Sequence, residues 1–270
     1  MGKAIKHIRA GLLNIEVLGK IPEKKPMQHR GARKNQTSAA MQFYNHKCSW
    51  RELELLIAKN LQRGMVIALT YDDDHLPANR EAAIKLLKKF IRKLRESRRK
   101  QGKPLIYFYN VEGLHGAEKN DFFGNDTHLE DHRLHHHFVV DGDDPDEIRS
   151  LWEYGYIRPE PLNVHYYREL AKYLTKEASE GKAKPGERTW NCSRSVKRID
   201  METDVEYYDI PSDGITLTAP EGAIDYTQFH EKNPYGFADC IGARYLLYPK
   251  ETPPPLSYAA GRKSKKALNF

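Results

Sequence analysis

Apolar residues recur three or four positions apart, as in amphipathic helices, in four stretches of the chain. They predict a helix from near Trp50 to Gly64 and further helices over residues 79–100, 144–154 and 164–179. The helix over residues 79–100 also has a basic face, with Lys and Arg side chains about one turn apart. Ordered structure is expected to begin with the Trp50 helix.

Shorter apolar runs between these helices are rich in β-branched and aromatic residues, which favour strands. They predict strands over residues 65–71, 105–111, 133–140 and 156–162, and two more near 205–210 and 243–248. From residue 50 to 179 the predicted order is helix, strand, helix, strand, strand, helix, strand, helix, which is not a repeated βαβ array. We therefore predict an α+β fold with one central, mostly antiparallel sheet and flanking helices that cover one of its faces.

The remaining segments are polar and divide the chain. Residues 1–40 are basic and have no hydrophobic period, so we expect them to be weakly ordered. Residues 113–131 are rich in Gly, Asp and Asn and predict a long loop. Residues 201–249 form a mixed C-terminal extension, and residues 250–270 form a basic, proline-containing tail that we expect to be disordered.

Basic side chains concentrate at the two ends of the chain. The sequence has 44 Lys and Arg against 37 Asp and Glu, a formal charge of +7. Residues 1–36 hold nine basic and two acidic side chains (+7), residues 250–270 hold five and one (+4), and residues 37–249 therefore carry −4. Basic ends are typical of proteins that bind a polyanion such as nucleic acid, and also of solvated tails that aid solubility.

Composition excludes several classes of protein. No apolar run approaches the roughly 18 residues that a membrane-spanning helix needs, and Asn14 and Glu16 interrupt the only apolar stretch of the basic N-terminus. The cysteines are odd in number and widely spaced, at Cys48, Cys192 and Cys240, which excludes a disulfide framework. We therefore expect a protein of a reducing cytoplasm that has no membrane partner.

Three consecutive histidines lie on the strand predicted over residues 133–140. Side chains of a strand alternate between its two faces, so His135 and His137 point the same way and His136 points the other way. Two imidazoles at this spacing can bind one divalent cation through neutral ring nitrogens. The competing interpretation is a histidine-rich surface strand that binds nothing.

A cation that activates a phosphate also takes oxygen ligands. Glu112 lies at the end of the preceding strand and is the best candidate for the third ligand, with His115 and Glu130 as alternatives. The sequence therefore predicts a metal site made by His135, His137 and one of these residues.

The last predicted helix contains Tyr173 and Lys176, which share a face because they are three residues apart. A tyrosine beside a lysine can attack a phosphodiester, since the cation stabilises the negative charge that develops on the oxygen atoms. The pair alone is common, and a single tyrosine on a helix is more often a packing residue.

The order of these two motifs is more specific than either motif. A His-His-His strand is followed by a helix and a strand, and then, 36 residues after His137, by a helix with Tyr-Leu-Thr-Lys. This arrangement resembles the HUH endonuclease superfamily, in which a bulky residue, here His136, separates two metal-binding histidines. Residues 68–71 (Ala-Leu-Thr-Tyr) and the stretch 188–197 also resemble parts of the replication proteins of small phages and plasmids, including relatives of filamentous-phage initiators. The resemblance covers about residues 40–200, which gives an endonuclease domain over residues 41–200.

This resemblance implies an RNA-recognition-like α+β fold and a specific reaction. Mg²⁺ or Mn²⁺ would be held by His135, His137 and a third ligand, and would polarise a phosphate of single-stranded or hairpin origin DNA. The Tyr173 hydroxyl would attack and leave a 5′-phosphotyrosine and a free 3′-OH, with Lys176 helping to place the ion or the tyrosine. A host DNA polymerase would extend the 3′ end, which is rolling-circle replication in a bacterial host cell, and a later attack by a 3′-OH would rejoin the strand.

The sequence also predicts partners and contacts. It has no Gly-x-x-x-x-Gly-Lys-Ser/Thr loop, so we expect no nucleotide cofactor, and a host helicase would unwind the DNA. Positions in the stretch after the tyrosine helix and on the basic helix face are candidates for contacts with nucleic acid. These are Arg188, Arg194, Lys197, Lys88 and Arg92.

Other readings use the same residues. Conjugative relaxases and single-strand transposases of the HUH type nick DNA by the same chemistry, although relaxases usually place the tyrosine before the histidines. A DNA-binding repressor on the same fold would need no catalysis. A histidine-triad nucleotide hydrolase needs a third histidine where Val139 stands, and a structural zinc site is disfavoured because no Cys-x-x-Cys pair exists. Some HUH proteins carry a second tyrosine one helical turn before the first, but Glu169 occupies that position here. Tyr166, two turns before Tyr173, is then the candidate for a second nucleophile.

Overall fold

The computed structural model describes residues 3–20, 39–113, 133–176, 188–210, 215–231 and 240–249. Within these ranges the chain forms ten strands and four α-helices. The helices are α1 (Ala39–Asn60), α2 (Arg80–Lys100), α3 (Pro145–Leu151) and α4 (Tyr167–Leu174). The strands are β1 (Lys3–Ala10), β2 (Leu13–Lys20), β3 (Met65–Thr70), β4 (Tyr107–Glu112), β5 (His135–Val140), β6 (Ile157–Pro161), β7 (Asn191–Cys192), β8 (Val205–Asp209), β9 (Ala223–Glu231) and β10 (Cys240–Leu247).

The strands form two five-stranded sheets. The first, here the terminal sheet, has the order β8-β1-β2-β10-β9, and the second, the central sheet, has the order β6-β3-β5-β4-β7. Every strand pair in both sheets is antiparallel. The α+β class and the mostly antiparallel central sheet are therefore confirmed, and the central sheet contains every strand predicted before residue 179.

The terminal sheet contradicts two expectations. Residues 3–20 were expected to be weakly ordered, but they form the hairpin β1–β2, which pairs with β8 and β10 from the C-terminal extension. Charged side chains such as Lys6 and Arg9 stand among the apolar ones and hide the alternation of the strands. Gly11 turns the hairpin at a φ of +60°, and a Cβ there would lie 2.3 Å from the carbonyl oxygen of Ala58. Residues 21–38 and 250–270 lie outside the described residues.

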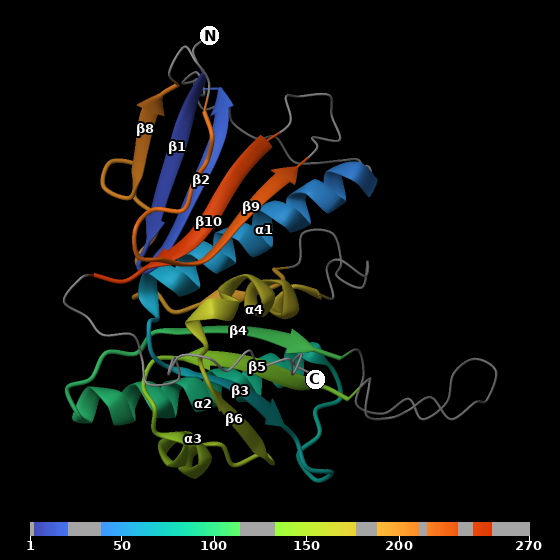
Figure 1. Cartoon of the computed structure of the whole chain (residues 1–270). Helices are drawn as coiled ribbons and strands as arrows, with labels where there is room; N and C mark the ends of the chain where they lie inside the picture. The colour runs from blue at the N-terminus through green and yellow to red at the C-terminus, as the bar shows by residue number, and fades with distance from the viewer. Residues whose placement is uncertain are drawn as a thin grey trace.

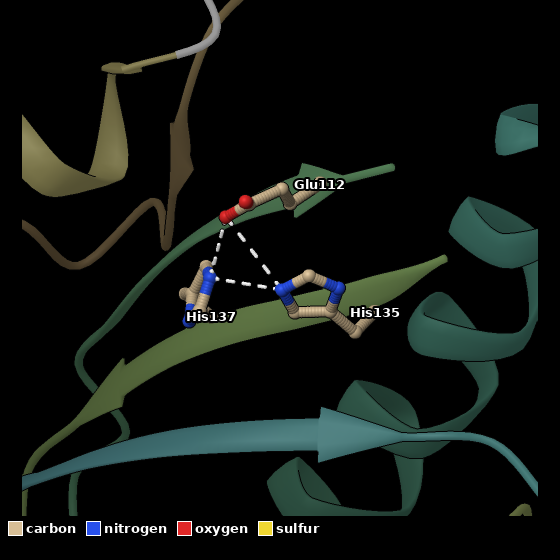
Figure 2. Close-up of side chains that lie close together, drawn as sticks. All are labelled: Glu112, His135 and His137. Atoms are coloured by element: carbon tan, nitrogen blue, oxygen red, sulfur yellow. Dashed lines mark hydrogen bonds and ion pairs between the residues drawn. The ribbon is translucent and has the colours of Figure 1, made fainter. Parts of the chain in front are cut away.

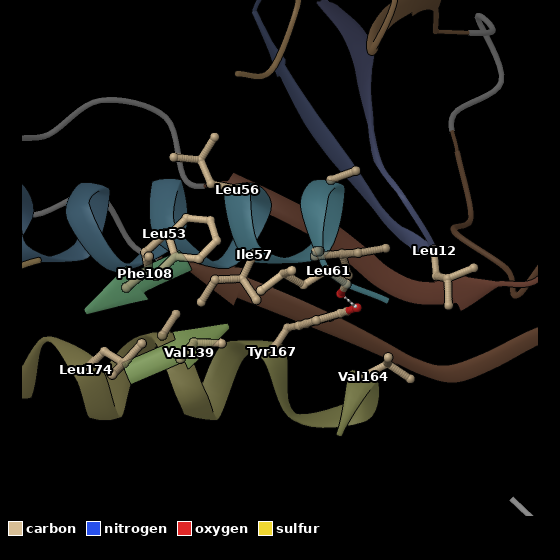
Figure 3. Close-up of a cluster of buried hydrophobic side chains, with 14 of the residues drawn as sticks. Leu12, Leu53, Leu56, Ile57, Leu61, Phe108, Val139, Val164, Tyr167 and Leu174 are labelled. Carbon is tan, nitrogen blue, oxygen red and sulfur yellow. Dashed lines mark hydrogen bonds between the residues drawn. The ribbon is translucent and has the colours of Figure 1, made fainter. Parts of the chain in front are cut away.

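Helix α1 lies between the two sheets (Figure 1). Its side chains Leu53 and Ile57 are fully buried and join one apolar cluster with Leu12 from the β1–β2 turn and with Phe108 and Val139 from the central sheet (Figure 3). Burying a side chain of this size contributes about 1.5–3 kcal/mol. Both sheets therefore share a core through α1, and α4 packs against the same helix.

The prediction that helices cover one face of the central sheet was wrong. Helices α2 and α3 cover the face that includes Phe138 and Val140, and α1 with α4 covers the face that includes Phe108 and Val139 (Figure 1). The second half of β5, Phe-Val-Val, is apolar and fully buried on both faces, as expected of a strand in a sheet that is covered on both sides. This uninterrupted apolar run is the sequence signal that the predicted one-sided arrangement left out.

Two helix boundaries also differ from the prediction. Helix α1 begins at Ala39 rather than near Trp50, because residues 42–45 are exposed and give this part of the helix no apolar period. Helix α4 is shorter than residues 164–179, since Val164–Tyr166 forms a 3₁₀ turn and Thr175 ends the α-helical pattern. None of the described helices combines the length and the apolar character that crossing a membrane requires.

Candidate metal centre and nucleophile

Three donor side chains meet at one end of the central sheet. Strands β4 and β5 pair so that Glu112 stands opposite His135, and Asn110 opposite His137. Alternation along β5 turns His135 and His137 toward the face that carries α4, as the sequence predicted. Glu112 is therefore the described residue that completes the predicted cluster, whereas the alternatives His115 and Glu130 lie outside the described residues.

The donor atoms of the three side chains converge (Figure 2). The Nε2 atom of His137 lies 2.7 Å from Oε2 of Glu112 and 3.1 Å from Nε2 of His135. The Nε2 atom of His135 lies 3.6 Å from the same carboxylate oxygen. One ligand atom from each residue lies within 4.8 Å of the others, which is the spacing of ligands around a single cation.

A hydrogen bond fixes the ring of His135. Its Nδ1–H donates to the carbonyl oxygen of Arg133 over 2.9 Å, so the lone pair of the neutral ring is on Nε2, which points at the cluster. Metal-binding histidines are commonly oriented in this way by a carbonyl group on the other ring nitrogen. Two imidazole nitrogens and one carboxylate are a donor set that fits a divalent cation.

The electrostatics of the cluster favour an ionised carboxylate. Burial alone would raise the pKa of Glu112, but hydrogen bonds from His135, His137 and Lys176 bring it well below its ordinary value. Burial lowers the pKa of His137, whereas contact with Glu112 raises the pKa of His135 in spite of its burial. An anion beside two imidazoles is an environment that a divalent cation can enter by replacing protons.

Tyr173 and Lys176 reach the same cluster from α4 and the turn after it. The Tyr173 hydroxyl lies 3.0 Å from Nε2 of His137, and the two rings meet at 67° with centroids 4.6 Å apart. The Lys176 Nζ lies 2.5 Å from Oε1 of Glu112 and 4.5 Å from the centre of the Tyr173 ring. Burial and the charge of Glu112 raise the pKa of Tyr173, so its phenol is protonated in the absence of a cation.

Two residues considered in the sequence lie elsewhere. His136 points into the core on the other face, where its Nε2 lies 2.6 Å from the Tyr71 hydroxyl, and burial lowers its pKa to about 3. Tyr166 is 41% exposed and precedes the first residue of α4, two turns before Tyr173. The structure therefore assigns His136 to the core and gives Tyr166 no described contact with the cluster.

The five predicted nucleic-acid contacts do not belong to the three-residue cluster. Lys88 and Arg92 are exposed on α2, which covers the opposite face of the central sheet. Arg188 and Arg194 are exposed beside β7, at the edge of that sheet. Lys197 is tied through its backbone to the side chain of Asn60 at the end of α1, with N···O distances of 2.8 and 2.9 Å.

Sequence reasoning missed the residues that hold α4 in place. Glu54 of α1 is 1% exposed and forms ion pairs with Arg244 of β10 at 2.7 Å and with Arg168 of α4 at 3.7 Å. A signal was present, because Glu54 interrupts the apolar stripe of its helix beside Leu53. A charged residue at a core position requires a partner, but the sequence does not indicate which one.

Comparison with protein-family models, with curated proteins and with solved structures found no match to this chain.

Proposed function

We propose that this protein is a metal-dependent single-strand DNA endonuclease and strand transferase that uses Tyr173 as its nucleophile. The observation that carries the proposal is the position of the Tyr173 oxygen, 3.0 Å from a ring nitrogen of a two-histidine, one-carboxylate cluster. A tyrosine fixed beside a candidate cation site is what phosphodiester attack by a phenol requires. The motif order supports the HUH type of this chemistry and, within it, an initiator of rolling-circle replication in a bacterial host.

Each residue has a defined part in the proposed reaction. His135, His137 and Glu112 would hold Mg²⁺ or Mn²⁺, and the bound ion would supply positive charge that polarises a DNA phosphate and favours the phenolate. The Tyr173 oxygen forms a bond to phosphorus as the bond from phosphorus to the 3′ oxygen breaks. The proton lost by the phenol balances the one gained by the leaving oxygen, which gives a 5′-phosphotyrosine and a free 3′-OH.

Lys176 would position the site rather than exchange protons. Its ammonium group contacts the carboxylate oxygen of Glu112 that does not face His137, and it lies against the Tyr173 ring. These two contacts fix the carboxylate and the tyrosine relative to one another. The positive charge also lies near the oxygen atoms that become more negative during attack.

A nicking assay tests the proposal. The protein is mixed with labelled single-stranded DNA covering many sequences, with Mn²⁺ or with EDTA, and a denaturing gel is examined for a covalent protein–DNA adduct. We expect an adduct that needs the metal and is lost in Tyr173→Phe. Tyr166→Phe is the matched control, because it removes the same hydroxyl from a tyrosine outside the cluster.

Two outcomes would contradict the proposal. An adduct that persists in Tyr173→Phe and is lost in Tyr166→Phe would move the nucleophile to Tyr166. A folded wild-type protein that binds DNA and Mn²⁺ without forming any adduct on a pool of random sequences would favour a DNA-binding protein without this chemistry.

A further inference from the structure

A row of basic side chains runs along one flank of α2. Lys88, Arg92, Arg95 and Arg99 follow one another at intervals of four, three and four residues, so they form one stripe, with a cation at each turn of about 5.4 Å. All four side chains are exposed. The stripe lies on the face of the central sheet opposite the candidate metal cluster (Figure 1).

Two further arginines extend this row at the sheet edge. Strand β7 pairs with β4, with Cys192 opposite Phe108, so the chain around it runs beside Tyr107 and Tyr109. Burial raises the pKa values of Tyr107 and Tyr109, and nearby cations oppose it. These are Arg95, which hydrogen-bonds the Tyr107 phenol, Arg194 beside Tyr107 and Arg188 beside Tyr109. Two segments, α2 and the chain around β7, therefore bring cations to one surface, here the α2–β7 surface. Its members are Lys88, Arg92, Arg95, Arg99, Arg188 and Arg194.

The exposed Glu96 lies among these cations on α2, but it pairs with Lys100. None of its six side chains forms an ion pair with another described residue. The other flank of the same helix differs, because Lys93 pairs with Glu153 and Arg98 pairs with Glu147. Like charges placed side by side repel one another unless an anion lies between them, so the surface is built for a polyanion.

The tyrosines of this surface indicate which form of nucleic acid fits. Proteins that bind single strands stack bases on exposed aromatic rings. Here Tyr107 and Tyr109 are each only 7% exposed, and the Tyr107 ring is stacked on Phe138 in the core. The surface therefore offers guanidinium and ammonium groups for phosphates, and its two tyrosine rings are closed to bases, which favours the backbone of a duplex.

We infer that the α2–β7 surface binds the phosphate backbone of double-stranded DNA, on the far side of the central sheet from Tyr173. This inference rests on the proposed function for the identity of DNA as the substrate. It adds a duplex-binding face to a site that acts on a single strand. Arg188 precedes β7 at the end of β4 that carries Glu112, so a strand leaving the duplex at that end would pass around the sheet edge toward the cluster.

Binding measurements without chemistry test the inference. Tyr173→Phe protein in EDTA is titrated against a short labelled duplex and a length-matched oligothymidine at several salt concentrations. In this background, Arg92→Gln/Arg99→Gln should weaken duplex binding by about tenfold or more and reduce the salt slope by about 2, because each phosphate contact contributes about 0.9. Lys172→Gln/Arg63→Gln removes the same charge from α4 and from the turn after α1, and should leave the duplex affinity within about twofold, because neither exposed residue belongs to the α2–β7 surface.

The outcomes separate this inference from the proposed function. Equal losses in the two double variants would overturn the inference, because overall charge alone would then explain binding. A loss confined to oligothymidine would assign the surface to single strands, and binding to anionic phospholipid vesicles in place of DNA would assign it to a membrane. Selective loss of duplex binding in a protein that never forms an adduct would support the surface and refute the nuclease.

Discussion

Glu54 and Glu112 are both enclosed carboxylates surrounded by nitrogen-bearing side chains, yet they differ in whether those side chains can give up a proton. Glu54 contacts two arginines and is 1% exposed, and Glu112 contacts two histidines and one lysine with a side chain that is 13% exposed. Arginine keeps its protons in proteins and offers no lone pair, whereas neutral histidine offers one. The first cluster can therefore only join structural elements, and the second can exchange protons for a metal ion.

The largest expected change in the free energy of unfolding comes from removing the Glu54 carboxylate. Glu54→Ala leaves Arg244 buried without its carboxylate, and removing one partner of a buried ion pair costs about 3–5 kcal/mol. Glu112→Ala in EDTA should cost less, about 1–3 kcal/mol, because its histidine partners can become neutral and Lys176 is partly exposed to water. Urea unfolding of the two variants measures the difference.

A double variant serves as the control for this measurement. Glu54→Ala/Arg244→Met removes the carboxylate and its more buried partner, leaves only the partly exposed Arg168, and should recover part of the stability lost in Glu54→Ala. If Glu112→Ala proved as destabilising as Glu54→Ala in EDTA, the Glu112 cluster would have to be considered a structural ion pair.

The second largest expected effect is the stabilisation of the folded chain by a metal ion, which only the Glu112 cluster should bind. Mn²⁺ at about 100 times its dissociation constant should raise the free energy of unfolding by about 2.7 kcal/mol, because a ligand that binds only the folded chain stabilises it. Mg²⁺ at the same concentration should do less, since it prefers oxygen ligands to imidazole. Calorimetric titration and urea unfolding check both statements.

Variants of each cluster make the metal measurement specific. Glu112→Gln and His135→Ala should abolish the stabilisation by Mn²⁺, and Glu54→Gln should retain it in full. Stabilisation that survives in Glu112→Gln and His135→Ala would place the ion somewhere other than this cluster.

Replacing Lys176 should have a smaller effect, which is an increase in metal affinity and a decrease in the rate of adduct formation. Its ammonium group contacts Glu112 and would repel an incoming cation, so Lys176→Met should tighten Mn²⁺ binding by about 1 kcal/mol, or about fivefold. The same variant should slow adduct formation, because it removes a charge beside the Tyr173 ring. Titration with Mn²⁺ and single-turnover nicking give the two values. A loss of metal affinity in Lys176→Met would mean that the lysine organises the ligands instead of competing with the ion.

The sequence predicted the chemical cluster better than it predicted the architecture around it. His135 and His137 were assigned to one face because alternation along a strand is a local rule, and Glu112 followed from its place at the end of the neighbouring strand. The terminal sheet was missed because β1 and β2 pair with strands from the other end of the chain. Pairing over that separation leaves no mark in a local pattern.

The partners of buried charges were equally out of reach. Glu54 lies on α1, Arg168 on α4 and Arg244 on β10, so their meeting depends on how α1 fits between the two sheets. The α2–β7 surface was also out of reach. The spacing on α2 predicts the basic stripe, but only the pairing of β7 with β4 brings Arg188 and Arg194 to that edge of the sheet. Sequence patterns specify faces of single elements, and packing decides which faces meet.

The smallest expected effect is on the pH dependence of stability. Burial raises the pKa of Glu54 and outweighs the opposing charges of Arg244 and Arg168. The folded chain then holds this proton more tightly than the unfolded chain, so the free energy of unfolding falls as pH rises from the ordinary carboxyl value of 4.5 toward the folded pKa. The slope from one proton is at most about 1.36 kcal/mol per pH unit. Glu54→Gln cannot titrate and should flatten this part of the curve, whereas Glu202→Gln, at an exposed position before β8 and without influence on the pKa of Glu54, should leave it unchanged. A Glu54→Gln curve with the slope of the parent would mean that the two arginines fully compensate the burial of the carboxylate.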